Sequence, residues 1–590
     1  MHSNLIPTNT TDNFLTKSRV SSTGNIMRRI LTLLLLFCSF AVCAQESPTS
    51  PLKLPPSFAG SYGELRRDHF HTGLDWRVGG VVGDTIYAIK SGYVSRLSVS
   101  IGGYGNAVYI THPDGTLSLY GHMHDFVPKY TALVEEKQYA SESFEVSLEF
   151  EEGCLPVEQG EAIGRVGNTG YSVAPHLHLE VRDLATQTPL NYLARGYYEV
   201  VDDIPPVFQR LFFFGYCDTL GLPLRYPLIS SNLPKSLSGT TVRLPHKSYL
   251  GIDAIDRQNG TTGKLAVTEY LVLLDQDTVF RFEVGEIHPK QGRYLSALRE
   301  TNIGGNDVIK TLVEPHNLLA EHIYAPKSGL IILNDYEEHD LKLRISDEHG
   351  NRSALHLKVR RDDALESSLS VIATALASEE DPRRIAMHWY IPHIFIDEGV
   401  TYTLPALSLY YSGWFPYAKV AEADSSLNIR SAVWKLGDPS LPLHSRGELF
   451  LECSLPDSLH SKACLAYYRD GVLSYAGGKW AGNGVRGSVG FGTWCVTTDT
   501  TPPTISFWER KGNILRAGGE LLIYLEDDFS GIKDYRVEID GKWHLSMFNR
   551  GRISLRLDPS RVSRGSMHTI VVKAEDNCGN STVVSREFFF

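Results

Sequence analysis

Two short motifs carry residue types that bind a divalent metal. His71 and Asp75 are separated by three residues, and His176 and His178 alternate later in the chain. Neutral imidazole and carboxylate are the usual zinc ligands outside thiolate sites, and three protein ligands with one open position form the catalytic arrangement. Residues i and i+2 of a strand face one side, so both histidines can face one cleft, where one binds metal and the other lies beside it. Gly73 permits the turn that brings His71 and Asp75 together.

Further histidines surround these motifs. His122 follows a tyrosine and a glycine, and an imidazole near the metal could take or deliver a proton because its ordinary pKa is about 6.5. His69 shares a strand face with His71 but has no carboxylate four residues on, so we expect it in an outer position or on the surface. His112 and His124 have no such neighbours and are expected to be solvated.

The order of these motifs resembles the LytM/lysostaphin-like zinc endopeptidases, peptidase family M23. The motifs that carry the resemblance are His71-x-x-x-Asp75, Tyr120-Gly121-His122 and Pro175-His176-Leu177-His178-Leu179-Glu180, with glycine-rich stretches at 103–106, 160–164 and 167–170. The resemblance covers roughly residues 55–195. It implies that His71, Asp75 and His178 hold one Zn²⁺ per chain. It also implies that His122 and His176 assist the attacking water and the transition state.

The function implied by the resemblance is that of a zinc metalloendopeptidase that hydrolyses peptide cross-links of bacterial peptidoglycan. The alternative is a non-catalytic LytM-like envelope factor that activates or scaffolds other cell-wall hydrolases. Such relatives typically lose zinc ligands, whereas this chain keeps every one, which favours the enzyme.

The N-terminus predicts export. Met27-Arg28-Arg29 is a positive segment, residues 30–42 are apolar, and cleavage is expected after Ala44. We therefore expect residues 1–44 to be a signal peptide, with Met27 as an alternative start, and the protein to reach the periplasm or cell envelope. The apolar run is too short for a membrane span, so the mature chain is expected to have none.

Charge and cysteine content exclude other classes. Lys+Arg 57 against Asp+Glu 68 gives a net charge of -11 with no basic block, which argues against nucleic acid as a partner. Of the eight cysteines, Cys38 and Cys43 fall in the predicted signal, and the others form no C-x-x-C pair, so a thiolate zinc site is not expected. Cys453 and Cys464 could bridge neighbouring strands, since export permits disulfides.

The fold class predicted is all-β: an antiparallel β-sheet LytM-like catalytic domain followed by β-sandwich modules. A chain of 590 residues needs about three to five domains. Strands are expected at 85–89, 93–97, 107–111 and 116–120, with a turn at Pro113-Asp114-Gly115 and no amphipathic helix between strands. An acidic insertion lies between His124 and Val157, and its alternating segment 143–150 predicts a strand that either lines the groove or forms a surface hairpin.

The remaining chain divides into three β-rich modules. After a catalytic domain at 45–200, we predict an insertion-bearing module resembling bacterial immunoglobulin-like domains at 201–362, a β-rich module at 363–498, and an immunoglobulin-like sandwich at 499–590. A length of roughly 150 residues predicts that the catalytic domain folds alone. The modules are candidate binding surfaces for envelope protein partners. Four aspartates at 253, 256, 527 and 528 could suggest calcium, but turn formation is the commoner reason for such residues.

Overall fold

The computed structural model describes residues 47–66, 68–219, 222–231, 240–300, 308–378, 384–510, 513–514, 516–517 and 520–590. The predicted signal peptide and its cleavage site lie outside the described residues. Within these ranges, no helix has both the length and the apolar character needed to cross a membrane. Pro48–Phe590 form one compact unit, and the description below concerns that unit.

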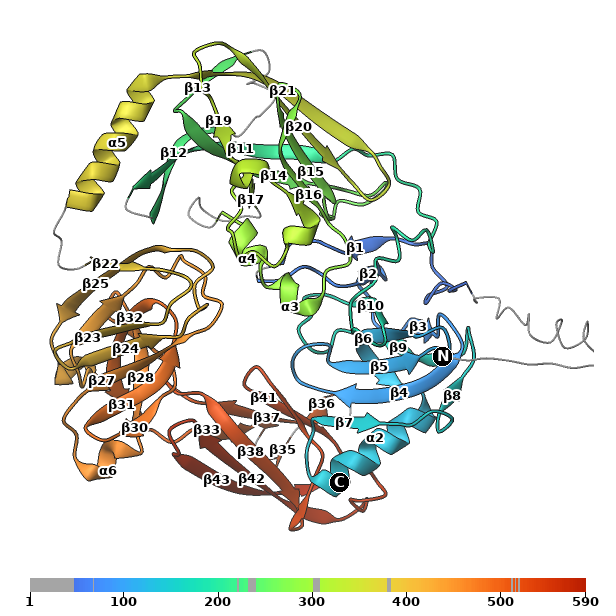
Figure 1. The fold of residues 1–590 in the computed structure, drawn as a ribbon. Helices are drawn as coiled ribbons and strands as arrows, with labels where there is room; N and C mark the ends of the chain where they lie inside the picture. The colour runs from blue at the N-terminus through green and yellow to red at the C-terminus, as the bar shows by residue number, and fades with distance from the viewer. Residues whose placement is uncertain are drawn as a thin grey trace, which may run out of the picture. The chain divides into compact units, whose positions relative to one another are not determined.

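The N-terminal part of this unit is one antiparallel sheet, with the strand order β1-β2-β10-β6-β5-β4-β7 along its main path (Figure 1). Its strands are β1 Phe58–Gly60, β2 Leu74–Arg77, β3 Thr85–Tyr87, β4 Gly92–Val99, β5 Asn106–Thr111, β6 Thr116–Phe126, β7 Val146–Glu149, β8 Pro156–Val157, β9 Ala162–Val166 and β10 His176–Asp183. The four strands expected from the sequence between residues 85 and 120 are present. The predicted turn is also present, because Gly115 has φ 79° and its N–H donates to the carbonyl of His112 at 3.2 Å.

Successive side chains of β10 point to opposite faces of the sheet, alternately toward the core and toward the candidate site. Leu177, Leu179 and Val181 are buried in the core of the sheet. Because side chains alternate along a strand, His176, His178 and Glu180 must project from the opposite face. The same strand lies between β2 and β6, with His178 opposite both Asp75 and Gly121. The sheet therefore places the two predicted metal-binding motifs side by side.

The acidic insertion contains a helix that the sequence did not predict. α2 spans Pro128–Ser141 and follows the strands at 85–120, among which we expected no amphipathic helix, so that expectation is not contradicted. Proline suits the first turn because its missing N–H has no helical partner there. Tyr130, Val134 and Gln138 are buried, a single row at four-residue spacing, which is too narrow to read as an amphipathic pattern. The predicted strand follows as β7, which pairs with the outer edge of β4.

Three further β-sandwiches follow, the third with an additional two-stranded sheet (Figure 1). Each sandwich has its own hydrophobic core. The first sandwich contains β11 Val207–Thr219, β12 Leu222–Ser231, β13 Thr241–Leu244, β14 Lys247–Ile255, β15 Glu269–Leu274, β16 Asp277–Glu283, β17 Val308–Lys310, β18 Ile323–Tyr324, β19 Ile331–Ile332, β20 His339–Ser346 and β21 Arg352–Arg361. Its short helices are α3 Pro289–Gly292, α4 Leu295–Leu298, η2 Ala320–His322 and η3 Pro326–Gly329. Its core includes Tyr62 and Phe70, which come from the segment between β1 and β2.

Helix α5, Asp363–Ser378, leads to the second sandwich. Its elements are β22 Arg384–Met387, β23 His393–Asp397, β24 Val400–Leu404, β25 Gly413–Ala421, η4 Ser425–Leu427, β26 Val433–Leu436, β27 Gly447–Glu452, α6 Asp457–His460, β28 Ala463–Arg469, β29 Val472–Tyr475, β30 Lys479–Ala481, β31 Gly484–Val489 and β32 Gly492–Thr498.

The third sandwich ends the chain. Its strands are β33 Thr504–Phe507, β34 Glu509–Arg510, β35 Asn513–Ile514, β36 Arg516–Ala517, β37 Glu520–Glu526, β38 Ile532–Ile539, β39 Lys542–Trp543, β40 Met547–Asn549, β41 Arg552–Arg556, β42 Met567–Asp576 and β43 Ser581–Phe589. The predicted all-β, largely antiparallel architecture is confirmed. The divisions after residues 200, 362 and 498 stay a proposal.

Candidate metal centre

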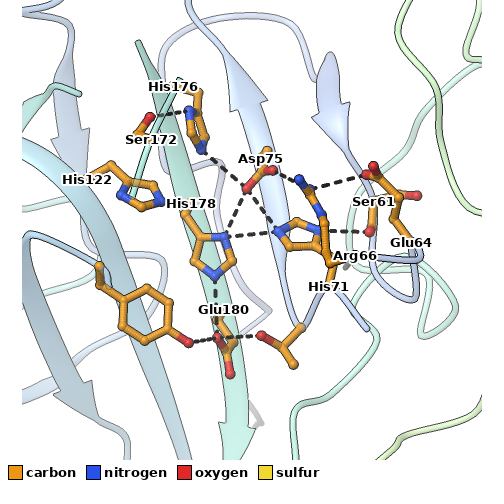
Figure 2. A network of polar contacts seen from close by, with 12 residues as sticks. Ser61, Glu64, Arg66, His71, Asp75, His122, Ser172, His176, His178 and Glu180 are labelled. Atoms are coloured by element: carbon orange, nitrogen blue, oxygen red, sulfur yellow. Dashed lines mark hydrogen bonds and ion pairs between the residues drawn. The ribbon is translucent and has the colours of Figure 1, made fainter. Parts of the chain in front are cut away.

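Three side chains converge on one point at the face of β2 and β10 (Figure 2). His71 Nε2 lies 3.0 Å from Asp75 Oδ1 and 3.1 Å from His178 Nδ1, and His178 Nδ1 lies 2.9 Å from Asp75 Oδ1. All three residues are buried. The sequence prediction of His71, Asp75 and His178 as a group is therefore matched by their positions.

The size of this triangle suits zinc. Ligand atoms about 2.0–2.1 Å from a tetrahedral zinc lie about 3.3–3.4 Å from one another. The triangle in the structure, with sides of 2.9–3.1 Å, is slightly tighter, so a small outward movement would accommodate the ion. Two imidazole nitrogens and one carboxylate oxygen are also the donor types that zinc prefers.

His71 is oriented by the main chain. Its Nδ1–H donates to the carbonyl of Ser61 at 2.8 Å, which leaves Nε2 with a lone pair directed at the other two ligands. Burial lowers the pKa of His71, so the neutral imidazole that a metal requires is the favoured form.

His178 is oriented by a buried carboxylate. Its Nε2 lies 3.3 Å from Glu180 Oε2, which leaves Nδ1 for the metal. Glu180 is in turn held by Thr72 Oγ1 at 3.0 Å, by the Tyr104 hydroxyl at 2.8 Å and by Arg182 Nε at 2.5 Å. Burial alone would raise the pKa of Glu180, but the hydrogen bond from His178 and the Arg182 charge lower it to about 2. A carboxylate behind a metal-binding histidine fixes its tautomer and raises its basicity.

The carboxylates beside His178 favour its doubly protonated form when no metal is bound. Burial would lower its pKa, yet the hydrogen bonds to Asp75 and Glu180 raise the pKa to about 9. Metal binding would release that proton, because only neutral imidazole is a ligand.

Asp75 is held from both sides. Its Oδ1 faces the two imidazoles, while Oδ2 accepts a hydrogen bond from Arg66 at 2.9 Å. Arg66 also reaches Glu64 at 3.2 Å. Burial would raise the pKa of Asp75, but its contacts with the imidazoles of His71, His176 and His178 hold that pKa well below its usual range. The carboxylate is therefore ionised and ready to bind a cation.

His122 and His176 stand beside the triangle rather than in it (Figure 2). Their ring centroids are 4.8 Å apart. The Nδ1–H of His122 donates to the carbonyl of Thr169 at 2.8 Å, and that of His176 to the carbonyl of Ala174 at 2.8 Å. Each ring therefore keeps Nε2 for the groove, and His176 Nε2 lies 3.5 Å from Asp75 Oδ1.

The environment of His122 favours its neutral form. Burial lowers the pKa of His122 to about 4, with the neighbouring His178 and His176 acting in the same direction. The residue also has the positive φ of 59°, an uncommon backbone conformation for a side chain other than glycine. A strained residue beside a metal-binding cluster is typical of functional sites.

The cluster opens into a groove of about 810 Å³. Its walls include Arg66, His69, Tyr104, Tyr171, Val173 and Ala174 around the metal-binding triangle and the two flanking histidines. His69 is exposed and lies 2.8 Å from Asp68, so it lines the groove without joining the ligands. No residue of the acidic insertion is among the described residues of this wall, and β7 lies at the sheet edge remote from β2.

Several supporting residues were not assigned from the sequence. Arg66, Tyr104 and the Ser61 carbonyl act through loops whose course no local pattern specifies. Glu180 stood in the quoted motif, and its i+2 spacing from His178 could have indicated that it shares the face of that histidine. His112, which we expected to be solvated, is buried and bonded to the Ser91 carbonyl and the Ser118 hydroxyl, so that expectation was wrong.

Two of the four aspartates considered for calcium, Asp256 and Asp527, lie in separate groups of carboxylates. Asp256 groups with Asp202 and Asp347, and Asp527 groups with Asp499 and Asp576. In each group one carboxylate caps a turn: Asp347 and Asp576 each accept backbone N–H groups from their own Gly-Asn turns. Asp253 instead pairs with Arg210 at 2.8 Å. Among the described residues, no disulfide joins Cys453 and Cys464.

Comparison with known proteins identifies the family. The family model described as "Peptidase family M23" matches residues 69–145, and the one described as "Zu5-like domain" matches residues 384–499. Lipoprotein NlpD of Yersinia enterocolitica is 32% identical over 117 residues, covering 20% of this chain and 96% of that protein. The chain therefore belongs to peptidase family M23, of the LytM/lysostaphin-like kind that its motifs resemble.

Two further matches, one to a protein sequence and one to a solved structure, likewise cover about a fifth of the chain. DD-carboxypeptidase/endopeptidase Mpg of Neisseria meningitidis serogroup B (strain ATCC BAA-335 / MC58) is 36% identical over 112 residues, which are 19% of this chain and 20% of Mpg. The chain thus spans about a fifth of the length of that relative. The catalytic domain of lysostaphin from Staphylococcus simulans is 23% identical, with TM-score 0.17 and coverage of 23% of this chain and 86% of that domain. The immunoglobulin-like character of the modules stays a prediction.

Proposed function

We propose that this chain is an exported, zinc-dependent endopeptidase that hydrolyses peptide cross-links of bacterial peptidoglycan. The observation that carries the proposal is the convergence of His71 Nε2, Asp75 Oδ1 and His178 Nδ1, each within 3.1 Å of the other two. Each of these side chains is also held by a second polar contact that directs the ligand atom inward. Membership of family M23 and the peptidase named among the relatives support the same class of activity.

One Zn²⁺ per chain would be held by His71, Asp75 and His178. When bound, zinc would polarise the scissile carbonyl and lower the pKa of a water molecule toward neutrality. The remaining chemistry belongs to the side chains of this chain.

His122 and His176 would handle protons and charge. Both present Nε2 toward the groove, as their Nδ1–H groups are committed to backbone carbonyls. A neutral imidazole can accept a proton and later give it to the leaving amine. The protonated ring can also donate a hydrogen bond to the oxyanion that develops on the peptide carbonyl. The open groove would hold an extended peptide across these two rings.

The proposal also covers the location of the protein and its partners. A peptidoglycan peptide is the proposed substrate, and the periplasm or cell envelope is the proposed location. The relatives include a protein named as a DD-carboxypeptidase/endopeptidase and one named as a lipoprotein, both compatible with an envelope role. The C-terminal sandwiches are candidate contacts for envelope protein partners.

A digest of purified peptidoglycan tests the proposal. Wild type should release soluble peptides whose new amino termini identify the cut bond by mass spectrometry, and His178→Ala should release none. The matched control is His124→Ala, an exposed histidine of the same domain outside the groove, which should act as wild type. If a zinc-loaded wild type releases nothing while it stimulates another cell-wall hydrolase, the non-catalytic envelope factor becomes the better description.

A further inference from the structure

The first sandwich holds the segment that carries His71. The N–H of Ala266 donates to the Ser61 hydroxyl at 2.9 Å, and the N–H of Ile287 donates to the Tyr62 hydroxyl at 3.0 Å. Both contacts are buried. Arg299 donates to the carbonyl of Arg66 at 2.6 Å. Three points of the sandwich are thus bonded to the segment between β1 and β2.

Apolar packing strengthens this attachment. Tyr62 and Phe70 lie in the core of the first sandwich, each only 3% exposed. The Phe70 ring centroid is 6.1 Å from that of Phe282 on β16. Burying two aromatic rings removes a large apolar area from water, which stabilises the attachment. The sandwich is therefore a fixed wall beside the metal-binding triangle.

A cavity of about 200 Å³ lies between this wall and the sheet. It shares His69, His71, Thr72 and Tyr104 with the lining of the groove, so it continues directly from it. Its far side is formed by Ile287, Pro289 and Gly292 of the first sandwich. The groove thus has a side cavity that the N-terminal sheet alone could not form.

The chemistry of the lining indicates what the cavity can hold. Phe70, Ile287 and Pro289 supply apolar surface. The polar groups opposite are bonded to one another, with Arg182 Nε 2.5 Å from Glu180 Oε1 and the Tyr104 hydroxyl 2.8 Å from Glu180 Oε2. These charged groups are already paired with one another, so they do not require a charged ligand. Pockets for whole small molecules measure about 300–1,000 Å³, so this smaller space suits one side chain.

We propose that the side cavity is a substrate subsite that receives the aliphatic side chain of the peptide residue next to the scissile bond. The first sandwich then determines specificity through Ile287, Pro289 and Gly292. This inference rests on the proposed peptidase function. It gives the first sandwich a role in substrate choice, beyond any role as a spacer or a binding module.

Gly292 provides a direct test. A Cβ built at Gly292 meets no heavy atom within 4 Å, although the residue is buried, so the first side-chain atom of Gly292→Leu is accommodated and the rest of the side chain is available to occupy the cavity. Ile287→Ala is the opposite change, because it enlarges the cavity while the backbone N–H bonded to Tyr62 remains. The matched control is Gly490→Leu, between β31 and β32 of the second sandwich, where a Cβ also meets nothing within 4 Å.

The readout is the preference between soluble peptides that differ only in having alanine or leucine beside the scissile bond, on either side of it. Wild type and Gly490→Leu should prefer leucine on one side, measured as kcat/KM and as Kd by fluorescence anisotropy. Gly292→Leu should reduce that preference at least about tenfold, since apolar side-chain discrimination of this size is worth about 10–200-fold. Zinc content should be unchanged, and cleavage of the alanine peptide should fall less than cleavage of the leucine peptide. Ile287→Ala should shift the preference toward side chains larger than leucine.

The two proposals fail in different ways. If wild type cleaves no peptide, the proposed function is lost, while the binding preference still decides whether the subsite exists. If wild type cleaves peptides and both variants keep its alanine-to-leucine ratio in turnover and binding, the subsite is refuted. Equal loss on every peptide in a zinc-loaded, folded Gly292→Leu also refutes it, because a subsite must discriminate.

Discussion

At the scale of single residues, each metal-binding side chain contacts the other two ligands and also one supporting group outside the triangle. The supporting groups are the Ser61 carbonyl for His71, Arg66 for Asp75 and Glu180 for His178. Such outer contacts hold each ligand atom in place before the metal arrives, so binding need not order the side chains. Removing a ligand should therefore abolish zinc binding, whereas removing its supporting contact should only weaken it.

Loss of a ligand should abolish the site. His178→Ala leaves two protein ligands, and we expect the purified variant to lose stoichiometric zinc, measured by elemental analysis. His124→Ala should keep one zinc per chain. A stoichiometric zinc content in His178→Ala would show that the metal is bound elsewhere.

Loss of the supporting carboxylate should weaken the site without destroying it. Glu180→Gln keeps the shape of the side chain but removes the charge opposite His178 Nε2. We expect zinc affinity to fall about 10–100-fold, the usual effect of changing a carboxylate behind a metal-binding histidine. Competition with a chelator measures this directly. Glu149→Gln on β7, remote from the groove, is the control, and equal affinities of the two variants would contradict the role given to Glu180.

Loss of a flanking histidine should separate binding from turnover. His122→Ala and His176→Ala should retain zinc, because neither ring belongs to the triangle. Each should lose roughly 10²–10⁴-fold in kcat, the usual value of a general acid or base. Steady-state kinetics on a soluble cross-link peptide measure the loss. Near-normal kcat in either variant would remove that residue from the proton-handling role.

At the scale of elements, the sequence predicted what depends on local spacing. Alternation at 176–178 was enough to place His176 and His178 on one face of a strand, and the Gly-containing turn was enough to bring His71 and Asp75 together. The pairing of β10 with β2 and β6 is long-range, and no local pattern indicated it. α2 was missed because its buried face is a single row of residues. The supports of the ligands come from loops, where contact partners depend on the whole fold.

The turn between β5 and β6 gives a prediction about acid stability. Lys90 is buried, and its Nζ lies 2.6 Å from Asp114 Oδ2. Burial would raise the pKa of Asp114, but the hydrogen bonds from Lys90 and Thr116 lower it to about 2. A carboxyl whose folded pKa lies below its unfolded value stabilises the fold above the unfolded pKa, and this contribution is lost as pH falls through the folded value.

Asp114→Asn should therefore destabilise the N-terminal sheet near neutral pH, by about 1 kcal/mol, because solvent screening at this partly exposed carboxylate reduces the full effect of the shift. The difference between wild type and variant should shrink as pH falls from about 4 to about 2. Thermal unfolding followed across this range is the measurement. Asp84→Asn, an exposed carboxylate just before β3, controls for the loss of a surface charge. A pH-independent difference would mean that the Lys90 pair contributes no charge-dependent stability.

At the scale of the whole molecule, the segment between β1 and β2 of the N-terminal sheet packs into the core of the first sandwich. From length alone we predicted that a catalytic domain ending near Glu199 folds independently. Tyr62 and Phe70 revise that prediction, because both would lose the core in which they are buried. Ala266 and Arg299 would also be lost from the segment that presents His71.

A chain ending near Glu199 should therefore bind zinc more weakly than one ending near Asp362, which retains the first sandwich. Two aromatic rings would become exposed, and the Ser61 carbonyl that orients His71 would lose the neighbouring bond from Ala266. We expect the short form to bind a hydrophobic dye, to unfold at lower temperature and to lose zinc to a chelator at lower chelator concentration. The longer form should match the full chain in zinc affinity, because the second and third sandwiches do not line the groove. A short form that is monodisperse and equal to the full chain in zinc affinity would show that the sheet holds its metal site unaided, and would leave the first sandwich only the side cavity as its part in catalysis.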